Sequence, residues 1–525
     1  LQSPPLQTST TAMADLSTGA DLSTGATDVS SVNGSETRHF RSLDEIYNET
    51  EIVDMIDELM LLKIEGPTSF NEATKEKEWQ DAMKLELETI EKNDTWTLTD
   101  LPPGHKPIGL KWVYKIKKDP EGNVVKHKAR LVAKGYVQKK GIDYNEVFAP
   151  VARLDTVRLL LALSAKEGWE VHHLDVKSAF LNGELHEEVY VKQPEGFIKK
   201  GQEKKVYKLT KALYGLRLAP RAWNARLDKC LKELGFKRCL HEQAVYTKSV
   251  GGNVIIVGVY VDDLLVTGSD KRKIEEFKLQ MNKQFEMSNL GLLSFYLGIE
   301  VNQGGMFTTL KQSAYAKKLL DKAGMLNCNS SKYPMEYKLQ LDKDEGGKLV
   351  DATEYRCVVG SLRYLTHTRP DISYAVGVVS RFMDKPTVKH QQAVKHILRY
   401  VRGTIDHGLV YVNEKSGKVL SGFSDSDLAG DVIDRRSTGG MCFYLNKSLI
   451  SWASKKQRVV ALSSCEAEYM AATTAACQSI WLRGLLEEIL GHQVGPVVLH
   501  VDNKSAIELM KNPVLHGRSK HIDVR

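Results

Sequence analysis

Apolar positions recur at helical spacing in several parts of the chain. Trp79, Met83, Leu87 and Ile90 fall at i, i+4, i+8 and i+11, so they share one face of a helix. Similar patterns predict further helices over 155–167, 206–234, 271–285, 311–323, 352–402 and 464–490. Between them lie shorter runs rich in β-branched and aromatic residues, which indicate strands. The chain is therefore predicted to mix helices and sheets.

Two such runs form a predicted hairpin at 109–135, GLKWVYKIKKDPEGNVVKHKARLVAKG. They flank Asp-Pro-Glu-Gly-Asn, a sequence typical of turns. In the second run Lys126, Lys128 and Arg130 alternate, so all three project from one face. Lysines also protect exposed edge strands against aggregation. The window 105–140, however, holds 11 Lys or Arg against 2 Asp or Glu, and so basic a window favours contact with phosphate.

A second hairpin is predicted at 253–268, where VYVDDLLVTG places two aspartates between apolar runs. Asp262 or Asp263 alone would be ordinary at a tight turn, because Asp tolerates turn conformations. As a pair within buried strands, each raises the pKa of the other, and their charge opposes folding. A divalent cation removes that penalty, and Mg²⁺ binds carboxylates together with substrate phosphates. The pair therefore predicts a metal site, which requires a third acid.

Asp175 is the candidate for the third acid. It ends the apolar run WEVHHLD (169–175), and two neighbouring strands of one sheet could bring it beside Asp262. Such a cluster could hold two cations about 3.5–4 Å apart, which clamp the attacking and leaving oxygens of a phosphoryl transfer. The alternative is that Asp175 caps a short helical turn at Ser178–Phe180. The spacing alone supports both interpretations equally.

The first 64 residues differ from the rest in composition. Rich in Ser, Thr, Gly and Asp, they carry 3 Lys or Arg against 11 Asp or Glu, and they are predicted to be a disordered acidic linker. Since the linker contributes −8 to a net charge of +7, residues 65–525 carry +15, which suggests a nucleic-acid partner. Seven scattered cysteines contain no Cys-x-x-Cys pair, so neither a zinc site nor a disulfide framework is indicated. No apolar run approaches the ~20 residues of a membrane-spanning helix, and no membrane partner is expected.

From residue 418 the pattern changes to alternating strands, the long helix at 464–490, a further strand and a short helix, an order typical of an α/β unit. Two of its carboxylates have close competitors, since Asp427 follows Asp425 and Glu468 follows Glu466. The four acids taken as candidates are Asp425, Glu466, Asp502 and Asp523.

Seven motifs carry a more specific signal. In chain order they are HLDVKSAFLNGELHEEVYVKQPEGF (173–197), LYGLRLAPRAW (213–223), YVDDLLVTG (260–268), LTHTRPDISYAVGVVSRF (365–382), DRRSTGG (434–440), SWASKKQRVVALSSCEAEYMA (451–471) and HGRSKHIDVR (516–525). Together they closely resemble the reverse transcriptase of copia-type LTR retrotransposons, over about 68–525. One position departs from the pattern: Leu218 stands where family members usually have Gln, in a loop near the template and nucleotide of related enzymes.

The resemblance implies that Asp175, Asp262 and Asp263 form a polymerase metal site with two Mg²⁺ ions, or Mn²⁺ in their place. A primer 3′-hydroxyl would attack the α-phosphate of a deoxynucleotide, and pyrophosphate would leave. Phe180, five residues after Asp175, would lie beneath the sugar and exclude a ribose 2′-hydroxyl, although an ordinary core position fits the sequence as well. The triphosphate would lie near the basic row Lys126, Lys128 and Arg130.

The resemblance also implies that the C-terminal unit is an RNase H-like domain. There, acids in the order Asp, Glu, Asp, Asp hold two Mg²⁺ ions that activate a water against the RNA strand of an RNA–DNA hybrid. The family pattern favours Asp425 over Asp427, and Glu466 over Glu468. Ser463-x-x-Glu466 also fits a helix capping box, which gives Glu466 a structural alternative.

The predicted fold is an α+β right-hand polymerase with fingers, palm and thumb, followed by an α/β RNase H-like domain. Its parts are a disordered acidic linker over 1–64, fingers and palm over 65–300, a mainly helical thumb and connection over 301–415, and the RNase H-like domain over 416–525, truncated at its C-terminus.

The predicted function is an RNA-directed DNA polymerase with a fused ribonuclease H, cut from a retrotransposon polyprotein. Its partners would be an RNA template, a DNA or RNA primer, an RNA–DNA hybrid and deoxynucleoside triphosphates. Its expected location is the cytoplasm, within virus-like particles, with entry to the nucleus. Because both chain ends look cut and Leu218 departs from the family pattern, the alternative is a catalytically silent, nucleic-acid-binding remnant.

Overall fold

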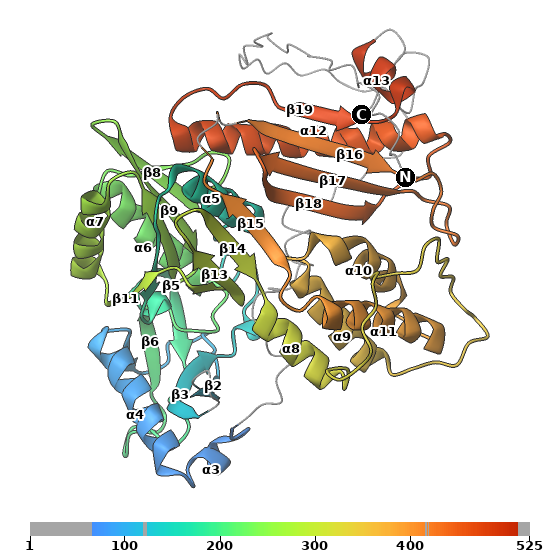
Figure 1. Cartoon of the computed structure of the whole chain (residues 1–525). Coiled ribbons are helices and arrows are strands. Elements are labelled where there is room, and N and C mark those ends of the chain that lie inside the picture. The colour runs from blue at the N-terminus through green and yellow to red at the C-terminus, as the bar shows by residue number, and fades with distance from the viewer. Residues whose placement is uncertain (1–65, 119–122, 415–416, 418, 513–525) are drawn as a thin grey trace, which may run out of the picture.

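The computed structural model describes residues 66–118, 123–414, 417 and 419–512 (Figure 1). The predicted linker over 1–64 and the candidate acid Asp523 lie outside these ranges. In the part of the chain that is described, no helix is both long and apolar enough to cross a membrane.

The N-terminal unit is built on the hairpin predicted at 109–135. Strands β2 (Leu110–Lys118) and β3 (Val124–Ala133) pair antiparallel, with Val113 opposite Arg130. Helix α4 (Lys77–Lys92), which follows the short helix α3 (Phe70–Ala73), packs on β3. Its predicted apolar face is buried, namely Trp79, Met83 and Ile90. The remaining sheet of this unit has the order β1-β6-β5, with β1 at Trp96–Thr99, β5 at Glu184–Val191 and β6 at Val206–Lys211.

The single helix predicted over 206–234 is wrong in its first part. Residues Val206–Lys211 form β6, because this segment pairs on both sides, with β1 and with β5. The helical part is α6 (Ala219–Glu233), which begins directly after Leu218.

A six-stranded central sheet follows. Its strands are β4 (Val171–Val176), β7 (Lys237–Arg238), β8 (Val245–Val250), β9 (Asn253–Tyr260), β10 (Asp263–Gly268) and β11 (Met287–Leu292), in the order β11-β4-β10-β9-β8-β7. Side chains alternate between its two faces. One face packs against α5 (Leu154–Glu167), and the other against α6 and α7 (Lys271–Gln284) (Figure 1).

The middle of the chain joins a small sheet to a group of helices. The strands are β12 (Phe295–Tyr296), β13 (Ile299–Gln303), β14 (Phe307–Lys311) and β15 (Gly408–Val412), paired in that order. The helices between β14 and β15 are α8 (Ser313–Lys322), α9 (Ala352–Leu365), α10 (Ser373–Val379) and α11 (Val388–Gly403). The segment predicted as mainly helical is so in its interior, but the predicted boundary at 300 falls within β13, because this sheet spans it.

The C-terminal unit has the predicted α/β order. Its strands are β16 (Leu420–Ser426), β17 (Thr438–Leu445), β18 (Ser448–Lys456) and β19 (Val498–Val501), and its helices are α12 (Ser464–Leu490) and α13 (Lys504–Lys511). The sheet order is β18-β17-β16-β19, and β19 runs parallel to β16. Helix α12 lies along this sheet (Figure 1).

One apolar core runs through three of these units. It contains side chains of α5, of β14 and β15, and of the C-terminal sheet with α12. Arg158 of α5 strengthens this junction from a position that is only 6% exposed. It donates hydrogen bonds to the carbonyl oxygens of Ile450 (2.8 Å) and His367 (2.9 Å) and lies over the ring of Trp452. The C-terminal unit is therefore fixed to the central sheet by buried contacts.

Candidate active sites

The turn between β9 and β10 holds the paired aspartates in a strained backbone. Tyr260 pairs with Asp263, so the loop has two residues, Val261 and Asp262. Val261 has a φ of +57°, a conformation that is an outlier for a β-branched residue. The turn is anchored on both sides, since the Trp223 indole donates to the Val261 carbonyl (2.6 Å) and the Val176 amide donates to that of Asp262 (2.9 Å). Strain of this kind concentrates at functional sites.

The register of β4 and β10 brings the third acid to this turn. Asp175 lies directly opposite Asp263, and Asp262 is one residue further along the turn. Burial raises the pKa of Asp262 to about 6, and the charges of Asp263 and Asp175 add to the rise, while Arg130 opposes it. The prediction that neighbouring strands of one sheet bring Asp175 beside Asp262 is confirmed. Asp175, the penultimate residue of β4, lies beside these acids, and the 3-10 turn η2 (Ala179–Asn182) that follows has no side-chain cap.

The two aspartates of the pair have different surroundings. Oδ1 of Asp263 lies 2.7 Å from Nε2 of His173, and the His173 ring meets Tyr296 edge to face. His173 is 9% exposed, so this hydrogen bond is shielded from solvent. The sequence pointed to it only indirectly, because His173 is two residues before Asp175 and therefore on the same face of β4. Asp262 has no such imidazole partner in the described structure.

Phe180 and Arg130, one member of the basic row, both contact the ring of Tyr214. Phe180 belongs to η2, and its ring centre lies 4.8 Å from that of Tyr214. Arg130 of β3 lies over the Tyr214 ring, 4.4 Å from its centre. Lys128 is half-buried and Lys126 is exposed on the same strand face. The charge of Arg130 thus acts on Asp262, Phe180 shares with Arg130 the contact to Tyr214, and Lys126 lies further out along the hairpin.

The C-terminal unit gathers a second group of acids. Asp425 lies on β16 and Asp502 directly follows β19, and because these strands are parallel, the two acids come to the same sheet edge. Glu468 of α12 completes the group, in which carboxylate oxygens of all three residues lie within 4.8 Å of one another. Burial raises the pKa of Glu468 to about 7, and Asp425 and Asp502 add to the rise. Among the described residues, only this group meets that distance. The carboxylate oxygens of Asp175, Asp262 and Asp263 do not all lie so close to one another.

The prediction of Glu466 as the inward acid is wrong, since Glu468 occupies that place. Glu466 Oε2 accepts from the Leu462 amide (2.8 Å), and Ser463 Oγ accepts from the Glu466 amide (3.1 Å), so Glu466 belongs to the N-terminal cap of α12. Residues two apart on a helix point about 200° away from each other, so only one of the two glutamates can reach the sheet edge. The preferred acid Asp425, and not Asp427, lies in this group: Asp427 Oδ1 accepts instead from the amides of Gly430 and Thr438.

The donor chemistry of both groups fits magnesium. All six acids are carboxylates, the ligands that Mg²⁺ takes together with phosphate oxygens. In the C-terminal group, Glu468 Oε1 accepts from the Ser426 amide (3.1 Å). Its Oε2 is buried without a hydrogen-bond partner among the described residues. A buried carboxylate oxygen in this state is unfavourable, and a bound cation would satisfy it.

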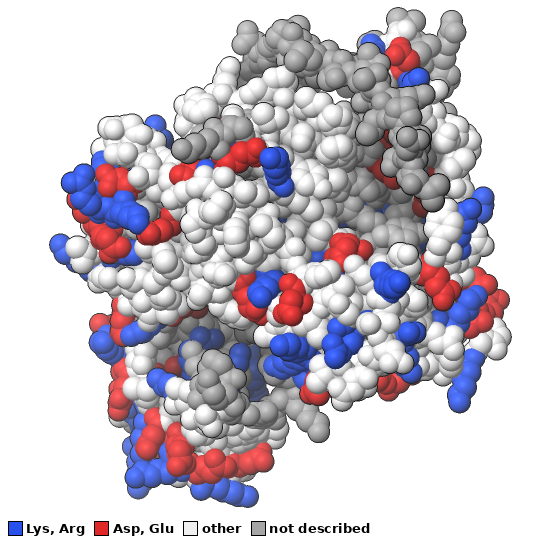
Figure 2. Space-filling view, viewed as in Figure 1, with Lys and Arg blue, Asp and Glu red and all other residues white. Residues whose placement is uncertain are grey.

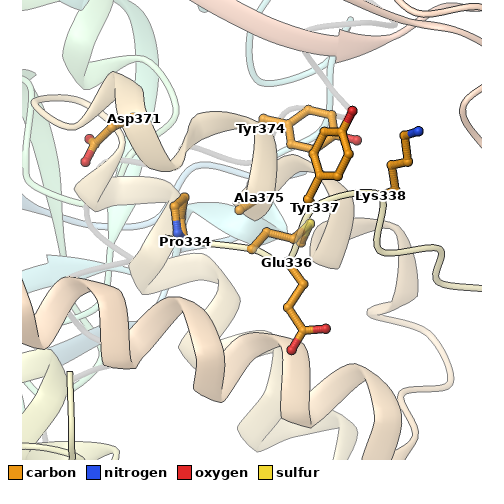
Figure 3. A pocket seen from close by; sticks show the side chains of 8 residues that line it. Pro334, Glu336, Tyr337, Lys338, Asp371, Tyr374 and Ala375 are labelled. Carbon is orange, nitrogen blue, oxygen red and sulfur yellow. The ribbon is translucent and has the colours of Figure 1, made fainter. Parts of the chain in front are cut away.

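A cavity of about 390 Å³ lies in the helical part of the chain, away from both groups of acids (Figure 3). It is lined by Pro334, Met335, Glu336, Tyr337, Lys338, Asp371, Tyr374 and Ala375. Its carboxylate Asp371 is bound to Arg369 (2.7 Å) and to the hydroxyl of Tyr400 (2.8 Å). This acid therefore has a structural role, and the candidate chemistry lies at the two acid groups.

Residues 301–412 give the molecule a positively charged surface (Figure 2). Residues 301–412 hold 17 Lys or Arg against 10 Asp or Glu, a net charge of +7. Figure 2 shows Lys and Arg over α8, α9 and α11 and around the hollow that separates these helices from the β2–β3 hairpin. Such a surface suits a polyanion.

Comparison with known proteins finds a reverse transcriptase family model and proteins of transposons. A family model described as reverse transcriptase (RNA-dependent DNA polymerase) matches residues 93–337. The chain is 43% identical over 455 residues to the retrovirus-related Pol polyprotein from transposon TNT 1-94 of Nicotiana tabacum, and 40% identical over 461 residues to that from transposon RE1 of Arabidopsis thaliana. These alignments cover 85% and 87% of this chain, which spans about a third of each relative, 34% and 31%. A putative transposon Ty5-1 protein of Saccharomyces cerevisiae is 33% identical over 305 residues, 57% of this chain and 98% of that protein.

Proposed function

Because the chain belongs to the reverse transcriptase family of copia-type retrotransposon Pol polyproteins, as its motifs predicted, we propose that it is an RNA-directed DNA polymerase. In this reaction a primer 3′-hydroxyl attacks the α-phosphate of a deoxynucleotide, and pyrophosphate leaves. The observation that carries the proposal is the β4–β10 register, which sets Asp175 opposite Asp263 and beside Asp262. The family implies the right-hand polymerase fold, in which we assign the β2–β3 hairpin to the fingers, the central sheet to the palm, and α8–α11 to the thumb and connection.

The palm residues have distinct parts in this proposal. Mg²⁺, or Mn²⁺ in its place, polarises the phosphate and lowers the pKa of the attacking hydroxyl when it is bound at these carboxylates, with two ions per site. Asp262 and Asp175 would hold the metal, and Asp262 would be available for it above a pH of about 6, where it is mostly ionised. Asp263 is the less essential ligand, because its Oδ1 is bound to His173.

The nucleotide is held by the residues around the acids. Phe180, beside the acids, lies beneath the sugar and excludes a 2′-hydroxyl. Arg130, whose charge already acts on Asp262, binds the triphosphate together with Lys128 and Lys126. Arginine suits this task because its guanidinium can donate two parallel hydrogen bonds to a phosphate.

We further propose that the C-terminal unit is a ribonuclease H that cuts the RNA strand of RNA–DNA hybrids. The supporting observation is the close group of Asp425, Glu468 and Asp502 at one sheet edge. Glu468 replaces Glu466 in this assignment. Asp523 stays the predicted fourth acid, and it lies outside the described residues. A nuclease beside a polymerase is useful when RNA is the strand that has been copied.

The substrates follow from this pair of activities. An RNA template, a DNA or RNA primer, their hybrid and deoxynucleoside triphosphates would bind along the basic face shown in Figure 2. The family further suggests that this takes place in the cytoplasm within virus-like particles, before the DNA enters the nucleus. Both of these statements are proposals, because the chain spans only about a third of the Pol polyproteins to which it is similar.

One observation favours a second candidate function, that of a catalytically silent nucleic-acid-binding remnant. Leu218, at the position where the family usually has Gln, is 2% exposed and packs in an apolar cluster, so it offers no polar group to a nucleotide. Primer extension on an RNA template with Mg²⁺ separates the two candidates, with Asp262→Asn as the inactive control. Incorporation by the wild-type chain alone supports the polymerase, whereas hybrid binding without incorporation establishes the remnant.

A further inference from the structure

The position of the Phe180 ring depends on more than its own backbone. Phe180 is half-buried and packs against two apolar cores, that of the N-terminal unit and that of the central sheet. Its turn follows Ser178, which has a φ of +50°. Gly183 closes the turn so near to α6 that an added Cβ would lie 2.5 Å from the Trp223 amide nitrogen. The backbone of this turn is therefore fixed, and the remaining freedom is that of the ring.

Tyr214 is the aromatic side chain that limits this freedom. Its ring is tilted by 52° against that of Phe180 at a centre-to-centre distance of 4.8 Å, a favourable geometry for an aromatic pair. The hydroxyl of Tyr214 shares the electrostatic environment of the acids, since burial raises its pKa to about 12 and the charges of Asp262 and Asp175 add to the rise. Tyr214 therefore contacts the residue assigned to the sugar and lies near enough to the acids to feel their charge.

Tyr214 itself is held by the fingers hairpin. Its carbonyl accepts a hydrogen bond from the Ala133 amide of β3 (2.7 Å). The next residue, Gly215, has a φ of +87°, and an added Cβ there would lie 2.3 Å from the Ala133 carbonyl oxygen. Arg130 covers the ring from the same strand. Backbone contact and a cation–π contact thus fix Tyr214 from one side, and Phe180 rests against it.

We propose that Tyr214 is the positioning residue for Phe180: by fixing the Phe180 ring, it sets the preference for deoxyribonucleotides over ribonucleotides. The inference rests on the proposed polymerase function and on the proposed contact of Phe180 with the sugar. A ring can reject a 2′-hydroxyl only if displacing it costs free energy. Tyr214 supplies part of that cost, because a displaced Phe180 loses its aromatic partner.

The test compares nucleotide selectivity in single and double variants of the full chain. The measured quantity is the ratio of kcat/KM for a deoxynucleotide to that for the matching ribonucleotide on one RNA template. Phe180→Ala should remove most of the selectivity, and Tyr214→Leu should lower it by roughly 2- to 12-fold, the worth of an aromatic pair expressed as a rate ratio. Tyr214→Phe keeps the ring and should keep the ratio. In the double variant, Tyr214→Leu should add nothing, because the ring that it positions is gone.

A matched control has the same ring geometry elsewhere. Tyr315 and Tyr364, in α8 and α9, also lie 4.8 Å apart and are tilted by 59°. Tyr315→Leu should leave the ratio unchanged, which separates the effect of Tyr214 from a general loss of stability. Should Tyr214→Leu fail to fold, Tyr214→Met replaces it, since methionine fills the space without a ring.

Each outcome has one meaning. If Phe180→Ala lowers the ratio and Tyr214→Leu does not, the positioning role is wrong and the proposed sugar contact stands. If Tyr214→Leu lowers both kcat/KM values equally, its role is only structural, which also overturns the inference. If Phe180→Ala leaves the ratio unchanged, the sugar contact fails and the inference fails with it. An inactive wild-type chain overturns the proposed polymerase itself.

Discussion

Replacement by glutamine should change the stability of the protein in opposite directions at two glutamates of α12. Glu466 and Glu468 are two residues apart and 7% and 5% exposed. Glu468 carries its charge beside Asp425 and Asp502, so Glu468→Gln should stabilise the protein in the absence of metal. Glu466 carries its charge at the start of a helix, where a negative charge is favourable. Glu466→Gln should therefore destabilise it.

The size of the first effect follows from the pKa of Glu468, which rises from 4.5 to about 7. A shift of about 2.5 units at ~1.36 kcal/mol per unit gives about 3 kcal/mol. Because the folded pKa is raised, the ionised form opposes folding: the penalty is absent below pH 4.5, grows as the pH rises to about 7 and is constant above that. Glu468→Gln should thus be up to about 3 kcal/mol more stable than wild type at pH 8 and nearly equal to it at pH 4.5. Glu466→Gln should lose roughly 0.3–1 kcal/mol at pH 8.

Thermal unfolding in EDTA at the two pH values measures both effects. Hybrid cleavage with Mg²⁺ provides the functional comparison, in which Glu468→Gln should be inactive and Glu466→Gln active. The reasoning would be refuted if Glu468→Gln were less stable than wild type at pH 8 without metal. Cleavage by Glu468→Gln combined with its loss in Glu466→Gln would return the metal site to Glu466.

Four further substitutions, at three positions, test the proposed polymerase site. Asp262→Asn should abolish DNA synthesis and spare hybrid cleavage, measured side by side on one preparation, and loss of both activities would contradict the separation of the two sites. His173→Gln can still donate to Asp263 and should keep the rate of DNA synthesis within a few-fold of wild type. His173→Leu leaves that carboxylate without its partner and should lower kcat roughly 10-fold. Equal rates for the two variants across a Mg²⁺ titration would exclude a role of His173 in orienting Asp263. Leu218→Gln restores an amide near the nucleotide and should raise kcat/KM roughly 2- to 12-fold, the worth of one hydrogen bond, and an unchanged steady-state rate would show that the departure at 218 is neutral.

Local patterns in the sequence were sufficient for the polymerase acids. The apolar strand before Asp175 and the paired aspartates between two apolar runs can each be read from the sequence, and the strand register makes them neighbours. The side chains that hold these acids and Phe180 in place could not be predicted from local patterns. The contact of Trp223 with the Val261 carbonyl and that of Tyr214 with Phe180 join segments far apart in the chain, and only the tertiary structure brings them together.

The error at Glu466 has a different origin, because the required signal was present in the sequence. Glu468 begins a series at alternating spacings of three and four, and all members of this series are buried: Glu468, Ala471, Ala475, Gln478, Leu482, Leu485 and Ile489. The series marks the inward face of α12. Glu466 is out of phase with it, and its carboxylate is bound instead to the Leu462 amide, just before the start of the helix. Helical phase was therefore a better guide than the order of the acids in the motif.

Both groups of acids oppose the stability of the fold that carries them. In each group a buried carboxylate has its pKa raised toward neutrality, to about 6 for Asp262 and about 7 for Glu468, by burial and by neighbouring acids. The turn that carries Asp262 adds a valine at a positive φ, which Trp223 and Val176 hold in place through the carbonyls of Val261 and Asp262. A sequence selected only for folding would remove these charges, since neutral side chains would be more stable there. A cation that binds the ionised groups offsets the cost in proportion to its affinity. The cost of burying these acids together is thus the physical argument for the proposal that both groups bind metal.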